Sequence, residues 1–182
     1  MAKWIGRPSV IELDALEQLP LEQATTVLSQ EQTPICCCSV EFSGPLQGQM
    51  VLAFEDASGL ALTDLLMEHP VGTNKEWTEL CISAVLETTN ILCCGYLNSL
   101  SQQLVFNSSS KDELLPGPPQ FQREFAESLM EFLLMPQAIQ FDQVIVATTR
   151  FQLNQMPVNW NLIFVPDAAS RIQLASLLDD HA

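Results

Sequence analysis

The chain has 182 residues, of which 47% are hydrophobic and 16% are charged, so it can form a domain with a real core and is not disordered by composition. Its net charge of −15 disfavours binding to nucleic acids or anionic membranes and favours encounter with a basic partner surface. No run of about 18 apolar residues occurs, and acidic and proline-containing sequence interrupts the start before a signal-type segment develops. We therefore expect a cytoplasmic protein that does not enter a membrane.

The first elements along the chain are predicted to be a helix and a hairpin. Residues 11–30 have a helical pattern that is interrupted by Pro20, which removes a helix hydrogen bond. The segment PICCCSVEF over 34–42 has the small and β-compatible side chains of a strand. The turn signal Ser43-Gly44-Pro45 then leads to a second strand over 49–54.

Two helices are predicted to follow this hairpin. Leucines at nearly helical spacing come after Asp56 and Ser58, which are residues that commonly cap helices. A long helix covers 79–102, and Thr73 or Asn74 is a candidate for its cap.

The second half is predicted to repeat this order of elements. We expect, in chain order, a short strand over 104–106, a loop over 107–119, a helix over 121–135, a hairpin of strands over 143–151 and 159–165, and a final helix over 167–178.

Two segments of the chain match one another. VLAFEDASGLALTDLL from Val51 resembles LIFVPDAASRIQLASLL from Leu162, with one extra residue. We infer an internal duplication within a single domain over 1–182, with pseudo-repeats at about 10–68 and 75–180. Halves that each expose an apolar face would most simply share a sheet. The predicted fold class is α+β: duplicated helix–strand–strand–helix halves that share one antiparallel sheet, with long helices packed on it.

The six cysteines are predicted to be structural. They occur at 36–38, 81 and 93–94, no C-x-x-C pair is present, and adjacent cysteines cannot easily converge on one tetrahedral metal. We therefore expect small buried side chains in a reducing compartment and no metal site.

The long helix carries polar residues along one face and mostly apolar residues elsewhere, and we call this polar face the seam. At about 100° per residue, Ser83, Glu87 and Asn90 follow the spacing i, i+4, i+7 and share one face. Nothing else in the chain looks equally suited to chemistry. A solvated helix face would show the same spacing, so the seam alone does not establish a site.

The sequence around the seam resembles the CheC family of chemotaxis phosphatases, relatives of CheX and FliY. The family pattern is Asp or Ser, three residues, Glu, two residues, Asn, and a proline somewhat over twenty residues later. Ser83, Glu87 and Asn90 match its helical part, and NILxxxYLNxLS is a longer match. Among the prolines of LLPGPP, alignment favours Pro119 over Pro116 or Pro118. The glycines of SGPLQGQMVLAF also resemble the family.

The chain departs from the family pattern in several places. CheC proteins typically carry two such helices. Aligning the two halves places Leu13, Glu17 and Pro20 opposite Ser83, Glu87 and Asn90, so the first copy would lack the serine and the amide. The family's glycine before the asparagine is Thr89 here, and its following Ala-Gly is Cys93-Cys94.

The resemblance implies hydrolysis of the phospho-aspartate of a CheY-like response regulator at one site. Asn90 would position the water, Glu87 would pair with a cation of the regulator, and Ser83 and Pro119 would contact the substrate. The regulator would supply Mg²⁺ and a lysine, so no cofactor of the chain's own is expected. The alternative is a non-catalytic protein that binds a phosphorylated receiver or a CheD-like partner. A structural flagellar-switch relative is a further alternative, although it would not need the Glu and Asn pair.

Overall fold

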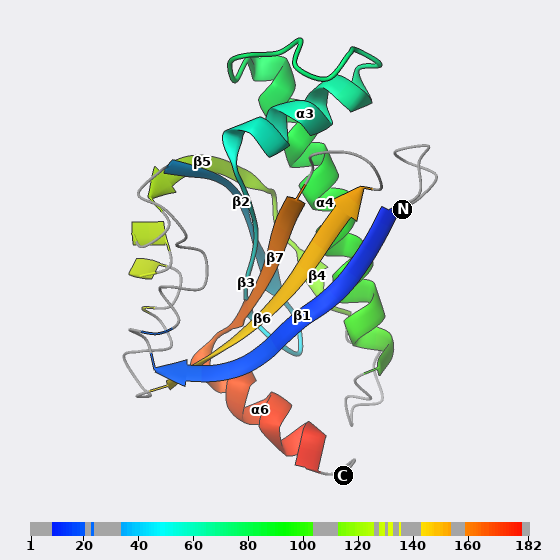
Figure 1. Cartoon of the computed structure of the whole chain (residues 1–182). Helices are drawn as coiled ribbons and strands as arrows, with labels where there is room; N and C mark the ends of the chain where they lie inside the picture. The colour runs from blue at the N-terminus through cyan, green and yellow to red at the C-terminus, as the bar shows by residue number, and fades with distance from the viewer. Residues whose placement is uncertain are drawn as a thin grey trace.

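The structure is a computed structural model in which one antiparallel sheet carries the helices (Figure 1). It describes residues 9–20, 23, 34–103, 113–125, 128–129, 131–132, 135, 143–153 and 159–179. The strands are β1 Ser9–Pro20, β2 Pro34–Ser43, β3 Gly48–Phe54, β4 Leu115–Pro116, β5 Gln120–Phe125, β6 Gln143–Leu153 and β7 Asn159–Pro166. The long helices are α3 Asp56–Leu66, α4 Glu79–Gln103 and α6 Ala168–Asp179. The predicted α+β class is therefore confirmed.

The order of the strands is nearly symmetric about the centre of the sheet. It runs β1-β6-β7-β3-β2, and both β4 and β5 pair with the outer side of β2. The hairpins β2–β3 and β6–β7 meet at the centre, where Val51 pairs with Ile163 and Leu52 pairs with Leu162. These are the two segments that match in sequence, and each leads into a helix, α3 or α6. The arrangement is compatible with the predicted duplication, and the duplication and its repeat boundaries stay a prediction.

The helix predicted for residues 11–30 is wrong over 11–20, because that segment lies in β1. β1 pairs with β6 along its length, with a bulge between Leu13 and Ala15. These long-range backbone hydrogen bonds outweigh the helix propensity of its leucine, glutamate and alanine residues. Of residues 21–30, only Gln23 is described. Leu13, Glu17 and Pro20 lie on a strand, so their alignment with the seam of α4 is also wrong.

The helix predicted for residues 121–135 is also wrong at its start, where β5 pairs with β2. In the segment QFQREF, Phe121 and Phe125 stand four residues apart, which fits one face of a helix as well as one face of a strand, and the pairing with β2 decides between them. Helical geometry begins later and is described at positions 128, 129, 131, 132 and 135. The strand predicted at 104–106 lies outside the described residues.

The main core lies between α4 and the sheet. Phe42 stacks on Phe164 with ring centroids 5.0 Å apart, and Phe54 stacks on Trp160 at 4.4 Å. Buried side chains of α4 complete this layer: Val85, Leu92, Cys93 and Leu97. Each fully buried aliphatic or aromatic side chain contributes roughly 1.5–3 kcal/mol, so this layer fixes α4 on the sheet. The opposite side of α4 is consequently free to carry function.

Gly59 allows α3 to pack closely against two aromatic rings. A Cβ at this position would lie 2.5 Å from Phe54 Cε2 and 2.6 Å from Trp77 Cη2. We expect Gly59→Ala to lower the free energy of unfolding by roughly 1–3 kcal/mol, because overpacking outweighs the better helix propensity of alanine. Urea unfolding measures the effect. A Cβ at Gly95 of α4 meets nothing within 4 Å, so Gly95→Ala should raise stability instead. Equal shifts in the two variants would contradict this explanation.

Candidate functional site

α4 begins at Glu79 because Thr78 caps it. Thr78 Oγ1 accepts a hydrogen bond of 3.2 Å from the backbone N–H of Cys81, which is the bond an N-cap residue makes. The predicted caps Thr73 and Asn74 are wrong, since both belong to the preceding loop. Their backbone N–H groups donate to the Asp64 carboxylate at 3.0 Å each and hold that loop against α3.

The predicted seam lies on the outward side of α4. The side chains of Ser83 and Glu87 are exposed, and Asn90 is half-buried at the margin of this face. The thiol of Cys94 donates a long hydrogen bond of 3.7 Å to Asn90 Oδ1. Most of the Asn90 hydrogen-bonding capacity is therefore free for a ligand, because the amide has four positions and a thiol is a weak donor.

Thr89, which stands where the family pattern has a glycine, does not belong to the seam. Thr89 is fully buried, its hydroxyl donates to the backbone oxygen of Val85 at 2.8 Å, and it hydrogen-bonds with Cys38 of β2. This residue therefore joins α4 to the sheet and leaves the outward face unchanged.

Pro119 is half-buried in the segment that joins β4 to β5. Gly117 N–H of this segment donates to Glu41 O at 2.7 Å, and just before β4 the Leu114 N–H donates to Ser101 Oγ of α4 at 3.3 Å. The residue after Pro119, Gln120, pairs with Ser39 of β2. Of the four predicted residues, Ser83, Glu87 and Asn90 therefore lie on α4, and Pro119 lies in the segment beside β2.

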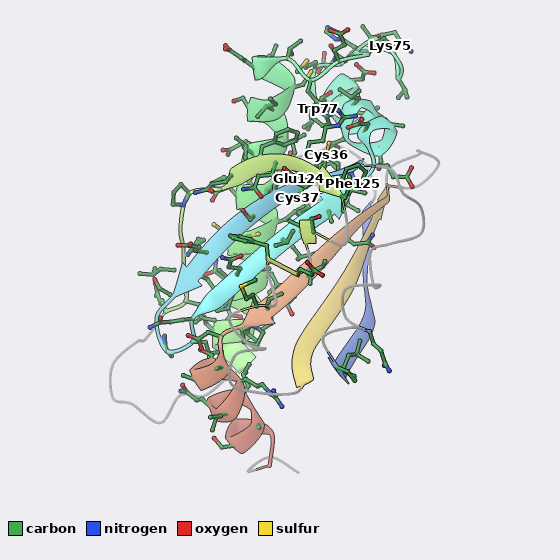
Figure 2. All side chains as sticks on the ribbon, turned by 90° about the vertical axis from the view of Figure 1, so that its left-hand side faces the viewer. Cys36, Cys37, Lys75, Trp77, Glu124 and Phe125 are labelled. Atoms are coloured by element: carbon green, nitrogen blue, oxygen red, sulfur yellow. The ribbon has the colours of Figure 1, made fainter. Side chains whose placement is uncertain are left out.

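Asp56 has a role that the sequence did not reveal. It was predicted as a helix cap, but its carboxylate accepts hydrogen bonds from Arg123 Nη2 at 2.5 Å, Trp77 Nε1 at 2.9 Å and Cys36 Sγ at 2.9 Å. Figure 2 shows Trp77 and Cys36 close together where α3 meets the sheet. Burial opposes the charge of Asp56, but the three sets of hydrogen bonds outweigh it and lower its pKa. Asp56 thereby links β2, β5 and the loop before α4 through hydrogen bonds.

The predicted structural role of the cysteines is confirmed for five of the six, which are buried and free: Cys36, Cys37, Cys38, Cys81 and Cys93. Burial raises the pKa of the Cys38 and Cys93 thiols to about 12, and that of Cys37 to about 11. These three thiols stay protonated at neutral pH and are poor nucleophiles. Within the described residues, no group of three His, Cys, Asp or Glu side chains could hold a metal ion.

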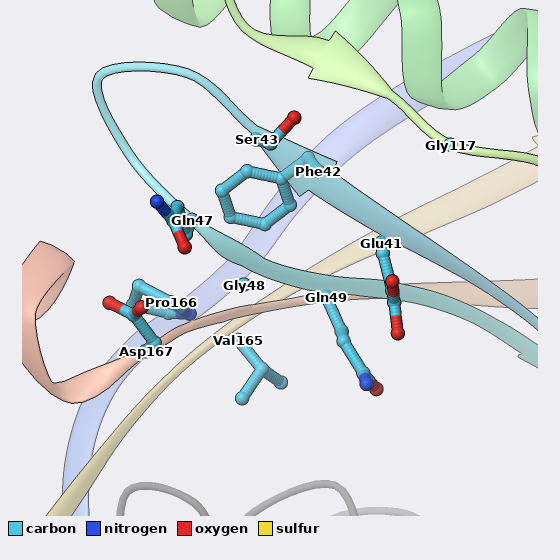
Figure 3. A pocket seen from close by; sticks show the side chains of 10 residues that line it. All are labelled: Glu41, Phe42, Ser43, Gln47, Gly48, Gln49, Gly117, Val165, Pro166 and Asp167. Atoms are coloured by element: carbon cyan, nitrogen blue, oxygen red, sulfur yellow. The ribbon is translucent and has the colours of Figure 1, made fainter.

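A surface depression of about 370 Å³ lies at the turn of the β2–β3 hairpin (Figure 3). Glu41, Gln49 and Asp167 give it an acidic and polar lining, and Gly117 reaches it from the β4–β5 segment. None of Ser83, Glu87, Asn90 and Pro119 lines it. The four predicted residues therefore do not belong to this depression.

α4 is long and apolar enough over Glu79–Gln102 to cross a membrane by length and composition. This is weak evidence for a membrane span, because core helices of soluble proteins have the same character.

The sequence matches no known protein family and no characterised protein, whereas the structure has clear relatives. Thermotoga maritima FliY superposes with a TM-score of 0.73 at 17% identity, covering 100% of this chain and 87% of that one. The middle domain of Helicobacter pylori FliM gives 0.60 at 13% identity, covering 97% and 86%. CheX in the Borrelia burgdorferi CheX–CheY–BeF₃–Mg²⁺ complex gives 0.54 at 12% identity, covering 91% and 89%. This chain therefore has the CheC-like fold that FliY, CheX and the FliM middle domain share.

Proposed function

We propose that this protein is a phosphatase of the phospho-aspartate of CheY-like response regulators. The observation that carries the proposal is the placement of the exposed Glu87 and the half-buried Asn90 one turn apart on α4. The existence of a CheX complex with CheY on the same fold supports this class of partner. We place the reaction in the cytoplasm.

Asn90 is proposed to position the attacking water. Its Oδ1 accepts a hydrogen bond from the water, and its Nδ2 donates to a phosphoryl oxygen, so the water lies in line with the bond that breaks. The water oxygen bonds to phosphorus, the bond to the aspartyl oxygen breaks, and the products are the free aspartate and inorganic phosphate. An uncharged amide suits this role because it is not repelled by the phosphoryl group. The regulator's own Mg²⁺ and lysine neutralise charge, so the chain needs no metal of its own.

Glu87 is proposed to hold the partner. Its carboxylate is exposed and makes no ion pair within the described part of the chain. A carboxylate directed at phosphate would be repelled, so its counterpart is a cation, for which the active-site lysine of the regulator is the candidate. Ser83, one turn earlier on the same face, supports this contact.

The proposal predicts catalytic turnover. A CheY-like receiver is phosphorylated with acetyl phosphate, excess donor is removed, and the loss of phospho-aspartate is followed with the chain at one-fiftieth of the receiver concentration. We expect a several-fold faster loss than the receiver shows alone. Acceleration only at equal concentrations, or binding without acceleration, would contradict catalysis and support the non-catalytic alternative.

A further inference from the structure

Cys94 continues the seam of α4 by one further turn. Ser83, Glu87, Asn90 and Cys94 are separated by four, three and four residues, so they lie along one side of the helix. Cys94 is half-buried, whereas the other five cysteines are buried. Its thiol donates to Asn90 Oδ1 over 3.7 Å, and among the described residues this is the one side-chain hydrogen bond of Asn90. The seam therefore contains a group that touches the amide proposed to position the water.

The other polar side chains beside Asn90 on its own helix are engaged elsewhere. The hydroxyls of Thr88 and Thr89 each donate to a backbone oxygen one turn earlier, at 2.8 Å. Cys93, the adjacent thiol, is fully buried and belongs to the core between α4 and the sheet. Within the described part of the chain, Cys94 is therefore the side chain that restrains the orientation of the Asn90 amide.

We propose that Cys94 is a positioning residue for the phosphatase reaction and acts by holding the amide of Asn90 through Oδ1. This inference rests on the proposed function, in which Asn90 positions the attacking water. The S–H donor distinguishes the two ends of the amide, because the oxygen accepts hydrogen bonds and the nitrogen only donates them. The bond uses one lone pair of Oδ1, so the second lone pair is left for the water and both hydrogens of Nδ2 are left for the phosphoryl group.

Such a restraint matters because the reaction needs one orientation of the amide. A half-exposed side chain without a partner exchanges between rotamers within nanoseconds. Only an orientation that accepts from the water and donates to the phosphoryl oxygen together is productive, so holding it before the receiver arrives favours the reaction. The CheC family pattern has a glycine where this chain has Cys94, and a glycine has no side chain to make this bond. The contact therefore comes from a residue in which this chain departs from that pattern.

The test compares Cys94→Ala with Cys94→Ser in single-turnover dephosphorylation of a CheY-like receiver charged with acetyl phosphate. We expect Cys94→Ala to lower the rate at saturating concentration about fivefold and to leave the half-saturating concentration unchanged, since one net hydrogen bond supplies a factor of this size. Cys94→Ser keeps a donor at this position and should retain at least half of the parent rate. Equal losses in the two variants, or a change in the half-saturating concentration alone, would contradict the positioning role.

Cys93→Ala is the matched control, because it removes the neighbouring thiol from the core and not from the seam. We expect it to lower the Tm by a few degrees and to keep the parent rate. Cys94→Ala should show the opposite pattern, with a nearly unchanged Tm and a reduced rate. If Cys93→Ala reduces the rate as much as Cys94→Ala does, the effect comes from packing of α4 and the inference is wrong.

A double-mutant cycle with Asn90→Ala tests whether Cys94 acts through the amide. We expect Cys94→Ala to cause no further loss of rate when Asn90 is already alanine. A further fivefold loss in that background would overturn the positioning role. If the parent accelerates dephosphorylation and Cys94→Ala matches it, the positioning role is wrong and the phosphatase proposal stands. If the parent accelerates the dephosphorylation of no receiver, the phosphatase proposal fails and this inference fails with it.

Discussion

Asn90→Ala is expected to reduce receiver dephosphorylation about 100-fold or more while the protein remains folded. Loss of one preorganised hydrogen-bonding group at the reacting centre costs this much in comparable sites. The fold should tolerate the change, since Asn90 is half-buried and its side chain has only the long bond from Cys94 among the described residues. The effect should fall on kcat, because the amide acts on the water and not on docking. Single-turnover decay of the phosphorylated receiver measures it.

Gln102→Ala is the matched control for that experiment. Gln102 is an exposed amide near the end of the same helix, about 18 Å along the axis from Asn90. It should retain the activity of the parent. Full activity in Asn90→Ala, or an equal loss in both variants, would remove the amide from the mechanism. Circular dichroism and thermal unfolding exclude a loss of structure as the cause.

Asp64→Asn is expected to produce the largest loss of stability, about 3 kcal/mol of unfolding free energy. Asp64 is fully buried at the end of α3, and its carboxylate accepts hydrogen bonds from the backbone N–H groups of Gly72, Thr73 and Asn74 and from Asn74 Nδ2. An asparagine would direct its NH₂ group toward some of these N–H donors, so buried N–H groups of the loop would lose their acceptor. Urea unfolding at pH 7 measures the loss, and Glu55→Gln, an exposed carboxylate with no side-chain cap bond, is the control.

The pH dependence of the same variant provides an independent check. Burial opposes the charge of Asp64, but the hydrogen bonds from the loop outweigh it and lower its pKa in the folded protein. The stabilisation is therefore present above the unfolded-state pKa of about 3.9 and is lost as the pH falls through the folded pKa. The difference in stability between the parent and Asp64→Asn should be constant near pH 7 and shrink below about pH 4. A difference that grows with acidification would contradict the assignment.

Much of the fold could be predicted because local pattern and tertiary structure agree. The segments that became β2, β3, β6, β7, α3, α4 and α6 all carry a clear period or a turn signal. β1 could not be recognised, since its leucines and glutamates favour a helix and only pairing with the distant β6 makes it a strand. β5 could not be recognised either, because the i, i+4 spacing of Phe121 and Phe125 also fits a helix and only pairing with β2 makes the segment a strand.

The candidate site was easier to predict than the contacts that support it. Ser83, Glu87 and Asn90 lie within two turns of one helix, so their common face follows from helix geometry alone. Asp56 instead collects its donors from β2, β5 and the loop before α4, which are up to 67 residues away in sequence. No local pattern indicates such a meeting point, because its members are brought together only by the sheet.

The pairing of β1 with the distant β6 affects how the protein folds while it is being synthesised on the ribosome. β1 pairs with β6, so Ser9 must find Leu153 at nearly the other end of the chain. Until that region has been synthesised, the first strand and the inner edge of β3 have no partners within the sheet. The ends of long loops must also be brought together before these contacts stabilise the fold, which makes folding of such topologies slow. The nascent chain therefore exposes strand edges throughout translation, and we expect it to depend on chaperones more than a protein whose halves fold in sequence.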